Sequence, residues 1–138
     1  AGRASADGAT RGKTVVEILG LTNVHVPSSK AHSAPLGIAF YTGEQFPEEY
    51  RGDLFVAFHG SWNRSPEQYG FFVVFVPFKD GRVAGDYEIF ASGFEGDSAV
   101  QSPGNANYRP CGLAVAPDGS LYISDDAKGR IWKVVYQG

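Results

Sequence analysis

The chain reads PLGIAF at residues 35–40 and PCGLAV at residues 110–115. Each copy is followed by a turn and by a second related stretch, GDLFVA at residues 52–57 and GSLYIS at residues 119–124. Apolar residues fill these stretches and turn residues separate them, a pattern typical of short antiparallel strands. The chain therefore contains an internal repeat built from strands.

Further strands are expected around the repeat. Lys79-Asp80-Gly81 and Pro117-Asp118-Gly119 place Asp-Gly where a hairpin needs positive φ. The run at residues 71–78, FFVVFVPF, is continuous rather than alternating, which indicates a sheet buried on both faces. The predicted strands are residues 15–19, 36–41, 53–58, 71–78, 87–91, 111–116, 120–124 and 130–136.

Repeats of about 40–50 residues with up to four short antiparallel strands indicate the blades of a β-propeller. We predict an all-β fold with two four-stranded blades, approximately at residues 14–100 and 101–138, after a polar linker or leader stub at residues 1–13. The second blade lacks an outer strand, and two blades cannot close a ring. Either further blades belong to a longer chain, or copies assemble with residues 15–19 of one chain completing the last blade of another.

Composition excludes several classes of protein. A net charge of -3 argues against nucleic acid as the partner, which needs clustered basic surface. No apolar run reaches the roughly 18 residues that span a bilayer. Cys111 is the single cysteine, so no disulfide forms within the chain. The 138 residues include no methionine, and we therefore expect a trimmed product or a piece of something longer.

Three stretches carry a resemblance to a known family: AHSAPLG at residues 31–37, GDLFVAFHGSWNR at 52–64 and RPCGLAVAPDGSLYISDD at 109–126. Over about residues 24–136, the chain resembles the C-terminal part of the PQQ-dependent sugar dehydrogenases, the sorbosone and soluble glucose dehydrogenase group. The resemblance implies a six-bladed propeller with the quinone over the channel mouth. It also implies oxidation of sugars or related aldehydes, PQQ held with a calcium ion, and a periplasmic or secreted location.

The resemblance covers only part of the family's site. The general-base histidine and much of the calcium site of the family lie in N-terminal blades that this sequence does not match. We therefore assign no catalytic or metal-binding residue here, and expect any calcium site to lie outside this chain. The expected cofactor-binding residues are His32, His59, Trp62, Asn63, Arg64 and Arg109.

The residue types at these positions suit a planar tricarboxylate. PQQ requires cations that bind carboxylates and flat surfaces for stacking. Arg109 precedes an inner strand where the family places a cofactor-binding arginine, although a surface turn arginine is the alternative. His59 and residues 62–64 are expected in the loop after the second strand, either lining the pocket or forming a polar loop. His32 either faces the cofactor or bonds to loop backbone.

Two nearby features have plainer interpretations. Cys111 stands where relatives carry a second arginine, and we expect a small core residue. Asp125-Asp126 lacks the acidic spacing of a calcium loop, so a turn is expected.

The leading function is part of a PQQ-dependent sugar or aldose dehydrogenase acting on a small sugar or aldehyde. The alternative is a catalytically inactive propeller module that binds sugar or protein through its loops.

Overall fold

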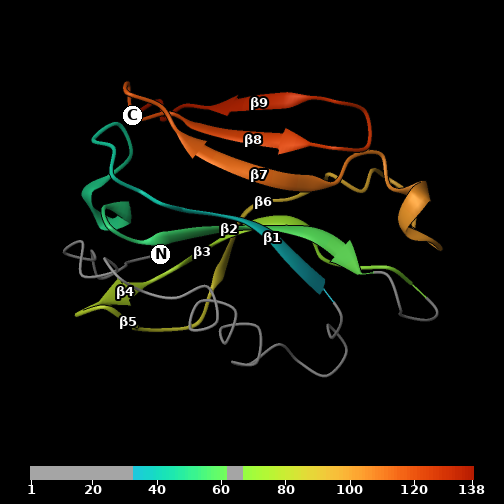
Figure 1. Ribbon diagram of the computed structural model, residues 1–138, viewed down its shortest axis with the longest axis horizontal. Coiled ribbons are helices and arrows are strands. Elements are labelled where there is room, and N and C mark those ends of the chain that lie inside the picture. The colour runs from blue at the N-terminus through green and yellow to red at the C-terminus, as the bar shows by residue number, and fades with distance from the viewer. Residues whose placement is uncertain (1–32, 62–66) are drawn as a thin grey trace.

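The computed structural model describes residues 33–61 and 67–138, and these form an all-β structure (Figure 1). The described residues contain no α-helix, only two short 3-10 helices, η3 (Glu48–Tyr50) and η4 (Pro103–Asn105). No helix in this part of the chain has the length and apolar character needed to cross a membrane. The predicted strand at residues 15–19 lies outside the described residues.

The strands of the described residues pair antiparallel within three sheets, whose orders are β1-β2-β3-β6, β4-β5 and β7-β8-β9. Their bounds are β1 (Ser33–Phe40), β2 (Leu54–Ser61), β3 (Phe71–Val76), β4 (Phe78–Lys79), β5 (Arg82–Val83), β6 (Glu88–Ala91), β7 (Pro110–Val115), β8 (Leu121–Asp125) and β9 (Ile131–Val134).

The first repeat forms the four-stranded sheet. All six residues of β3 are buried, which confirms the expectation of a sheet buried on both faces. Side chains alternate between the faces of a strand, so the apolar residues divide into two clusters. One face contributes Phe55, Ala57, Val73 and Phe75 to the larger cluster. The other face carries Leu54, Val56, Phe58, Phe72, Val74 and Val76.

The predicted strand at residues 71–78 is wrong in one respect, because it breaks at Pro77. Proline has no N–H to continue the ladder, so β3 ends at Val76. The chain then turns into the β4–β5 hairpin, where Asp80 has a φ of 51° and Gly81 one of 72°. The carboxylate of buried Asp53 accepts a hydrogen bond from the N–H of Phe78 at 3.0 Å. This bond fixes the start of the hairpin.

The second repeat forms the three-stranded sheet. The β7–β8 turn was expected to place Asp118 and Gly119 at positive φ, but only Gly119 adopts it, with a φ of 83°. The Asp118 side chain instead accepts a hydrogen bond from the Ser120 N–H at 3.0 Å, which stabilises an ordinary turn conformation. Gly129 supplies the positive φ, 69°, in the turn before β9.

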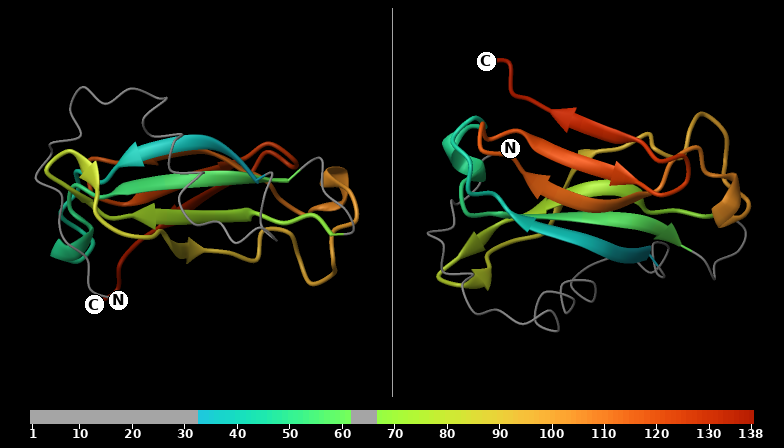
Figure 2. Two further views of the ribbon diagram at one scale, coloured as in Figure 1. Left: turned by 90° about the horizontal axis from the view of Figure 1, so that it is seen from below. Right: turned by 45° about the horizontal axis from the view of Figure 1, so that its top comes forward.

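The two sheets lie as two layers (Figure 2), with the first strands of the repeats, β1 and β7, side by side. Leu121 and Ile123 of β8 join the larger cluster, where they face the side of the first sheet that carries Phe55. By the repeat these two residues correspond to Leu54 and Val56, on the opposite face of the first sheet. The sheets are therefore stacked in the same orientation, one behind the other.

Glycine allows the closest approach between the layers. A Cβ atom on Gly37 of β1 would lie 2.4 Å from the carbonyl oxygen of Cys111 in β7. A glycine at this position therefore serves close packing between β1 and β7. The six-bladed ring, and the division into blades at residues 14–100 and 101–138, stay predictions.

Candidate functional site

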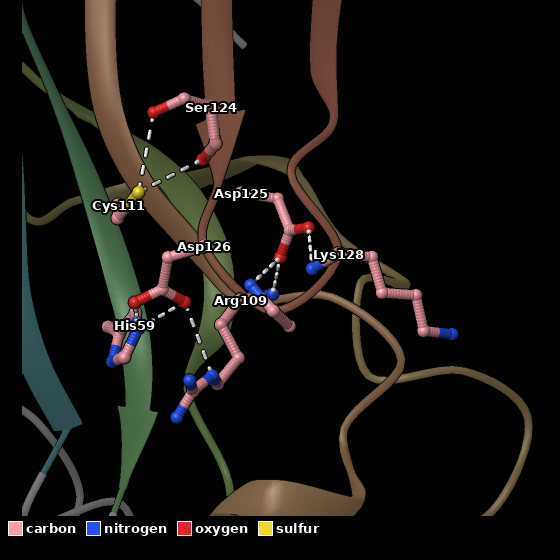
Figure 3. A network of polar contacts seen from close by, with 8 residues as sticks. His59, Arg109, Cys111, Ser124, Asp125, Asp126 and Lys128 are labelled. Carbon is pink, nitrogen blue, oxygen red and sulfur yellow. Dashed lines mark hydrogen bonds and ion pairs between the residues drawn. The ribbon is translucent and has the colours of Figure 1, made fainter.

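The candidate site lies where the two repeats meet at one end of the sheets (Figure 3). His59 is in β2, Arg109 directly precedes β7, and Asp126 directly follows β8. Alignment of GDLFVAFH at residues 52–59 with GSLYISDD at residues 119–126 places His59 and Asp126 at the same position of the repeat. Stacking the repeats in one orientation brings these equivalent strand ends together.

His59 is part of a strand rather than of the loop that was predicted for it. Strand β2 continues to Ser61, because His59 pairs with Phe71 of β3 and Ser61 pairs with Ser33 of β1. The strand pairing of β2 therefore extends beyond residues 53–58, the apolar run from which the strand was predicted. Pairing on both sides fixes the backbone from which the imidazole projects.

Asp126 joins His59 to Arg109. His59 Nε2 lies 2.9 Å from both carboxylate oxygens of Asp126. Arg109 Nε forms an ion pair with Asp126 Oδ1 at 3.3 Å. The side chains of His59 and Arg109 are 19% and 28% exposed, so a ligand can reach both. The structure thus gathers one imidazole, one guanidinium and one carboxylate at a surface accessible to solvent.

Asp125 builds the turn beneath this cluster. Its buried carboxylate accepts hydrogen bonds from the backbone N–H groups of Arg109 at 2.6 Å, Ala127 at 3.0 Å and Lys128 at 2.8 Å. Burial acts to raise the pKa of Asp125, but these N–H groups outweigh it and hold the pKa below its ordinary value. The expected turn at Asp125-Asp126 is therefore present, and it fixes the backbone of Arg109.

Cys111 is half-buried in β7 and faces Ser124 of the neighbouring strand. Its Sγ lies 3.3 Å from Ser124 Oγ and 3.6 Å from the Ser124 carbonyl oxygen. The thiol therefore packs against the sheet beside the site.

Of the six predicted cofactor-binding residues, the structure brings together His59 and Arg109. The other four, His32, Trp62, Asn63 and Arg64, lie outside the described residues. Residues 62–70 connect β2 to β3, and within this connection the N–H of Tyr69 donates a hydrogen bond to Ser61 Oγ, at the end of β2, at 2.9 Å. No group of three or more His, Cys, Asp or Glu side chains within 33–61 and 67–138 is arranged to hold a metal ion.

Sequence reasoning missed Asp126. The acidic pair was considered only as a calcium loop or a turn, and 67 residues separate Asp126 from His59. The available signal was the repeat itself, because equivalent positions of adjacent repeats lie near one another.

One family model matches most of the chain. Residues 24–137 match the family described as TrAA12-like. A pyrroloquinoline quinone-dependent pyranose dehydrogenase of Coprinopsis cinerea is 35% identical over 115 residues, which cover 73% of this chain and 15% of the relative. An uncharacterized protein of Borreliella burgdorferi is 40% identical over 108 residues, which cover 78% of this chain and 27% of the relative.

Solved structures show the same relationship. A calcium structure of Trichoderma reesei Carbohydrate-Active Enzymes Family AA12 is 27% identical, covers 73% of this chain and 24% of that chain, and has a TM-score of 0.50. A glucose dehydrogenase at 24% identity, covering 75% of this chain and 23% of that chain, has a TM-score of 0.51 and supports the fold alone. The chain spans about a quarter or less of the length of these relatives. With most of its length matched, the chain belongs to the TrAA12-like family.

Proposed function

We propose that the chain forms part of the quinone pocket of a PQQ-dependent sugar or aldose dehydrogenase, on its C-terminal side. The observation that carries this proposal is the meeting of His59 and Arg109 at Asp126, from two different repeats. Family membership supports it, because the relative from Coprinopsis cinerea is a pyrroloquinoline quinone-dependent enzyme.

The residues present fit a carboxylate-bearing cofactor. The ion pair of Arg109 with Asp126 is made through Nε, and Figure 3 shows one terminal nitrogen of the guanidinium lying farther from that carboxylate. A guanidinium edge of this kind binds a carboxylate through two parallel N–H groups. In the proposed enzyme, Arg109 binds and orients one carboxylate of PQQ, while His59 borders the same surface. The bound quinone accepts the electrons removed from the sugar.

The proton-accepting base of this reaction belongs to the N-terminal blades implied by the family resemblance, and calcium is expected to bind there. We therefore predict that the chain supplied with PQQ and calcium does not oxidise glucose by itself. A dye-reduction assay tests this prediction. Turnover of about 10 per second or more, which is ordinary for enzymes, would place the base within this chain.

The larger fold is proposed to be a six-bladed propeller. Its support is the common orientation of the two sheets, since stacking like faces in one direction continues from blade to blade. The outer face of the second sheet carries Ile131, which is 69% exposed. Three copies of the chain, with two blades each, would complete a ring of six blades. Further blades in a longer chain would complete it equally well. Light scattering separates these outcomes, because a stable monomer at micromolar concentration would exclude the trimer.

One observation favours the alternative, a binding module without catalysis that takes sugar or protein through its loops. A hollow of about 420 Å³ lies in the loop after β6, and its lining includes none of His59, Arg109 and Asp126. Its lining offers hydrogen-bonding groups suited to hydroxyls, from Glu95, Asp97, Ser98, Gln101, Asn105 and Asn107. A periplasmic or secreted location suits either function and stays a prediction.

Calorimetric titration with PQQ and calcium tests the leading proposal. Arg109→Ala is expected to weaken binding tenfold or more, because hydrogen bonds to charged groups contribute about 1.5–3 kcal/mol. Arg82→Ala is the matched control, since exposed Arg82 lies in β5 outside the cluster. Equal affinities for the wild type, Arg109→Ala and Arg82→Ala would remove Arg109 from the pocket. Absence of PQQ binding by the wild type would favour the module.

A further inference from the structure

We propose that Asp126 is a positioning residue, which holds the imidazole of His59 and the guanidinium of Arg109 in fixed orientations and so presents the guanidinium to an anionic ligand. The ligand class rests on the proposed function. The positioning itself rests on contacts within the chain, and it is tested without any ligand.

The contact with His59 determines which ring nitrogen carries a proton. A carboxylate only accepts hydrogen bonds, so Nε2, at 2.9 Å from both Asp126 oxygens, must be the donor. In the neutral ring, Nδ1 is then left with its lone pair. Within the part of the chain that the structure describes, the imidazole of His59 has no hydrogen-bond partner other than Asp126. Asp126 therefore directs Nε2 toward its own carboxylate and, in the neutral ring, leaves Nδ1 as a hydrogen-bond acceptor.

The contact with Arg109 works together with the neighbouring aspartate. Asp125 binds the backbone N–H of Arg109 at 2.6 Å, and Asp126 holds its Nε at 3.3 Å. The backbone N–H of Asp126 also donates to the Arg109 carbonyl oxygen at 3.4 Å. The Asp125-Asp126 pair thus holds Arg109 at its backbone and at the inner edge of its guanidinium. Because the ion pair is made through Nε, the outer edge of the guanidinium keeps N–H groups for a ligand.

Fixing both groups before binding has an energetic consequence. A long side chain such as arginine loses rotamer freedom when it orders, and a site that is already ordered avoids this cost at the moment of binding. Removing Asp126 also removes a negative charge, and this loss of charge by itself strengthens the binding of an anionic ligand. The two effects have opposite signs, so the affinity of an Asp126 variant separates positioning from simple electrostatics.

Nuclear magnetic resonance on the full chain without ligand tests the positioning. In the wild type, we expect a His59 Nε2–H signal protected from exchange and a rigid Arg109 Nε–H group. Asp126→Ala is expected to accelerate exchange of the His59 proton about tenfold, the effect of losing one hydrogen bond to a charged group, and to make Arg109 mobile. Asp126→Glu should restore part of both signals. Asp86→Ala, which removes an exposed carboxylate outside the cluster, should change neither.

Unchanged His59 and Arg109 signals in Asp126→Ala would overturn the proposal, provided that the core amide signals show a folded protein. If Asp126→Ala does not fold, Asp126→Gly, which also removes the acceptor, replaces it and the same signals decide. PQQ affinity gives a second readout. Positioning predicts at least tenfold weaker binding by Asp126→Ala, whereas tighter binding would show that its charge alone matters. If the wild type binds no PQQ, the proposed function fails while the resonance experiment still decides the role of Asp126.

Discussion

The two repeats begin with the same sequence pattern but differ in how deeply their sheets are buried. In the first sheet, Phe55 and Val73 are 0% exposed, since their face packs against the second sheet. The equivalent positions of the second sheet hold Tyr122, which is half-buried, and Ile131, which is 69% exposed. The same strand pattern therefore occurs in two environments. How much a side chain contributes to the free energy of unfolding depends on whether another sheet covers it.

The largest difference is expected at Phe55 and Tyr122. Phe55→Ala should lower the free energy of unfolding by about 4 kcal/mol, because a fully buried aromatic side chain leaves a cavity. Tyr122→Ala should cost about 1 kcal/mol, since a half-buried ring loses less apolar contact. Urea denaturation of both variants measures the difference. Equal losses would show that the second sheet is covered as fully as the first.

Next come the equivalent glycines Gly37 and Gly112. Gly37→Ala should cost about 3 kcal/mol, because its Cβ would meet the rigid backbone carbonyl of Cys111. At Gly112 the new Cβ would lie 2.6 Å from Ser124 Oγ, and this hydroxyl can rotate away. Gly112→Ala should therefore cost about 1 kcal/mol or less. A larger loss at Gly112 than at Gly37 would mean that β1 and β7 are not the point of closest approach.

Asp125 and Phe58 occupy one repeat position but stabilise it differently. Phe58 is apolar, whereas Asp125 binds three backbone N–H groups, so only the second sheet depends on pH here. Asp125→Ala should cost about 2 kcal/mol at pH 7. Its pKa is lowered in the folded state, so this stabilisation is present above the ordinary value of about 4 and is lost as the pH falls through the folded-state value.

Urea midpoints at pH 7 and pH 3 check this dependence. The difference between wild type and Asp125→Ala should shrink at pH 3, while Asp86→Ala controls for the loss of one negative charge. A constant difference at both pH values would exclude the carboxylate as the stabilising form.

The smallest effect is expected at Lys133, which takes the repeat position of buried Phe75. Its ammonium donates a hydrogen bond to Asp118 at 2.8 Å, and this bond lowers the pKa of Asp118 well below its usual range. Both side chains are exposed, and exposed ion pairs contribute little to stability. Lys133→Ala should leave the urea midpoint unchanged at neutral pH, and a clear drop would mean that this face is shielded from water.

Much of the fold could be predicted because its signals are local. Apolar runs, Asp-Gly turns and the repeated PLGIAF pattern identified most strands of the described residues within a few residues, although the short strand β5 was not predicted. Two errors had non-local or single-residue causes. Pro77 interrupts a run that is otherwise uniformly apolar. Strand β2 extends through His59 to Ser61 because of its partners β1 and β3, which the sequence of β2 alone does not reveal.

The candidate site was harder to predict. His59 and Arg109 were chosen by resemblance to a family, and neither sequence position indicates that they share a partner. The contacts of Asp126 with these two residues arise from the stacking of the two sheets, which brings equivalent strand ends together. Asp125 likewise binds N–H groups on both sides of β8, and this geometry depends on the β7–β8 pairing.

The most direct test of the central claim, that two repeats build one anion-binding site, is a PQQ titration of the full chain followed by nuclear magnetic resonance. We predict that His59 of the first repeat and Arg109 of the second shift together and saturate with the same Kd. Shifts confined to the hollow around Glu95 and Asn107, or shifts of His59 and Arg109 with different Kd values, would contradict it.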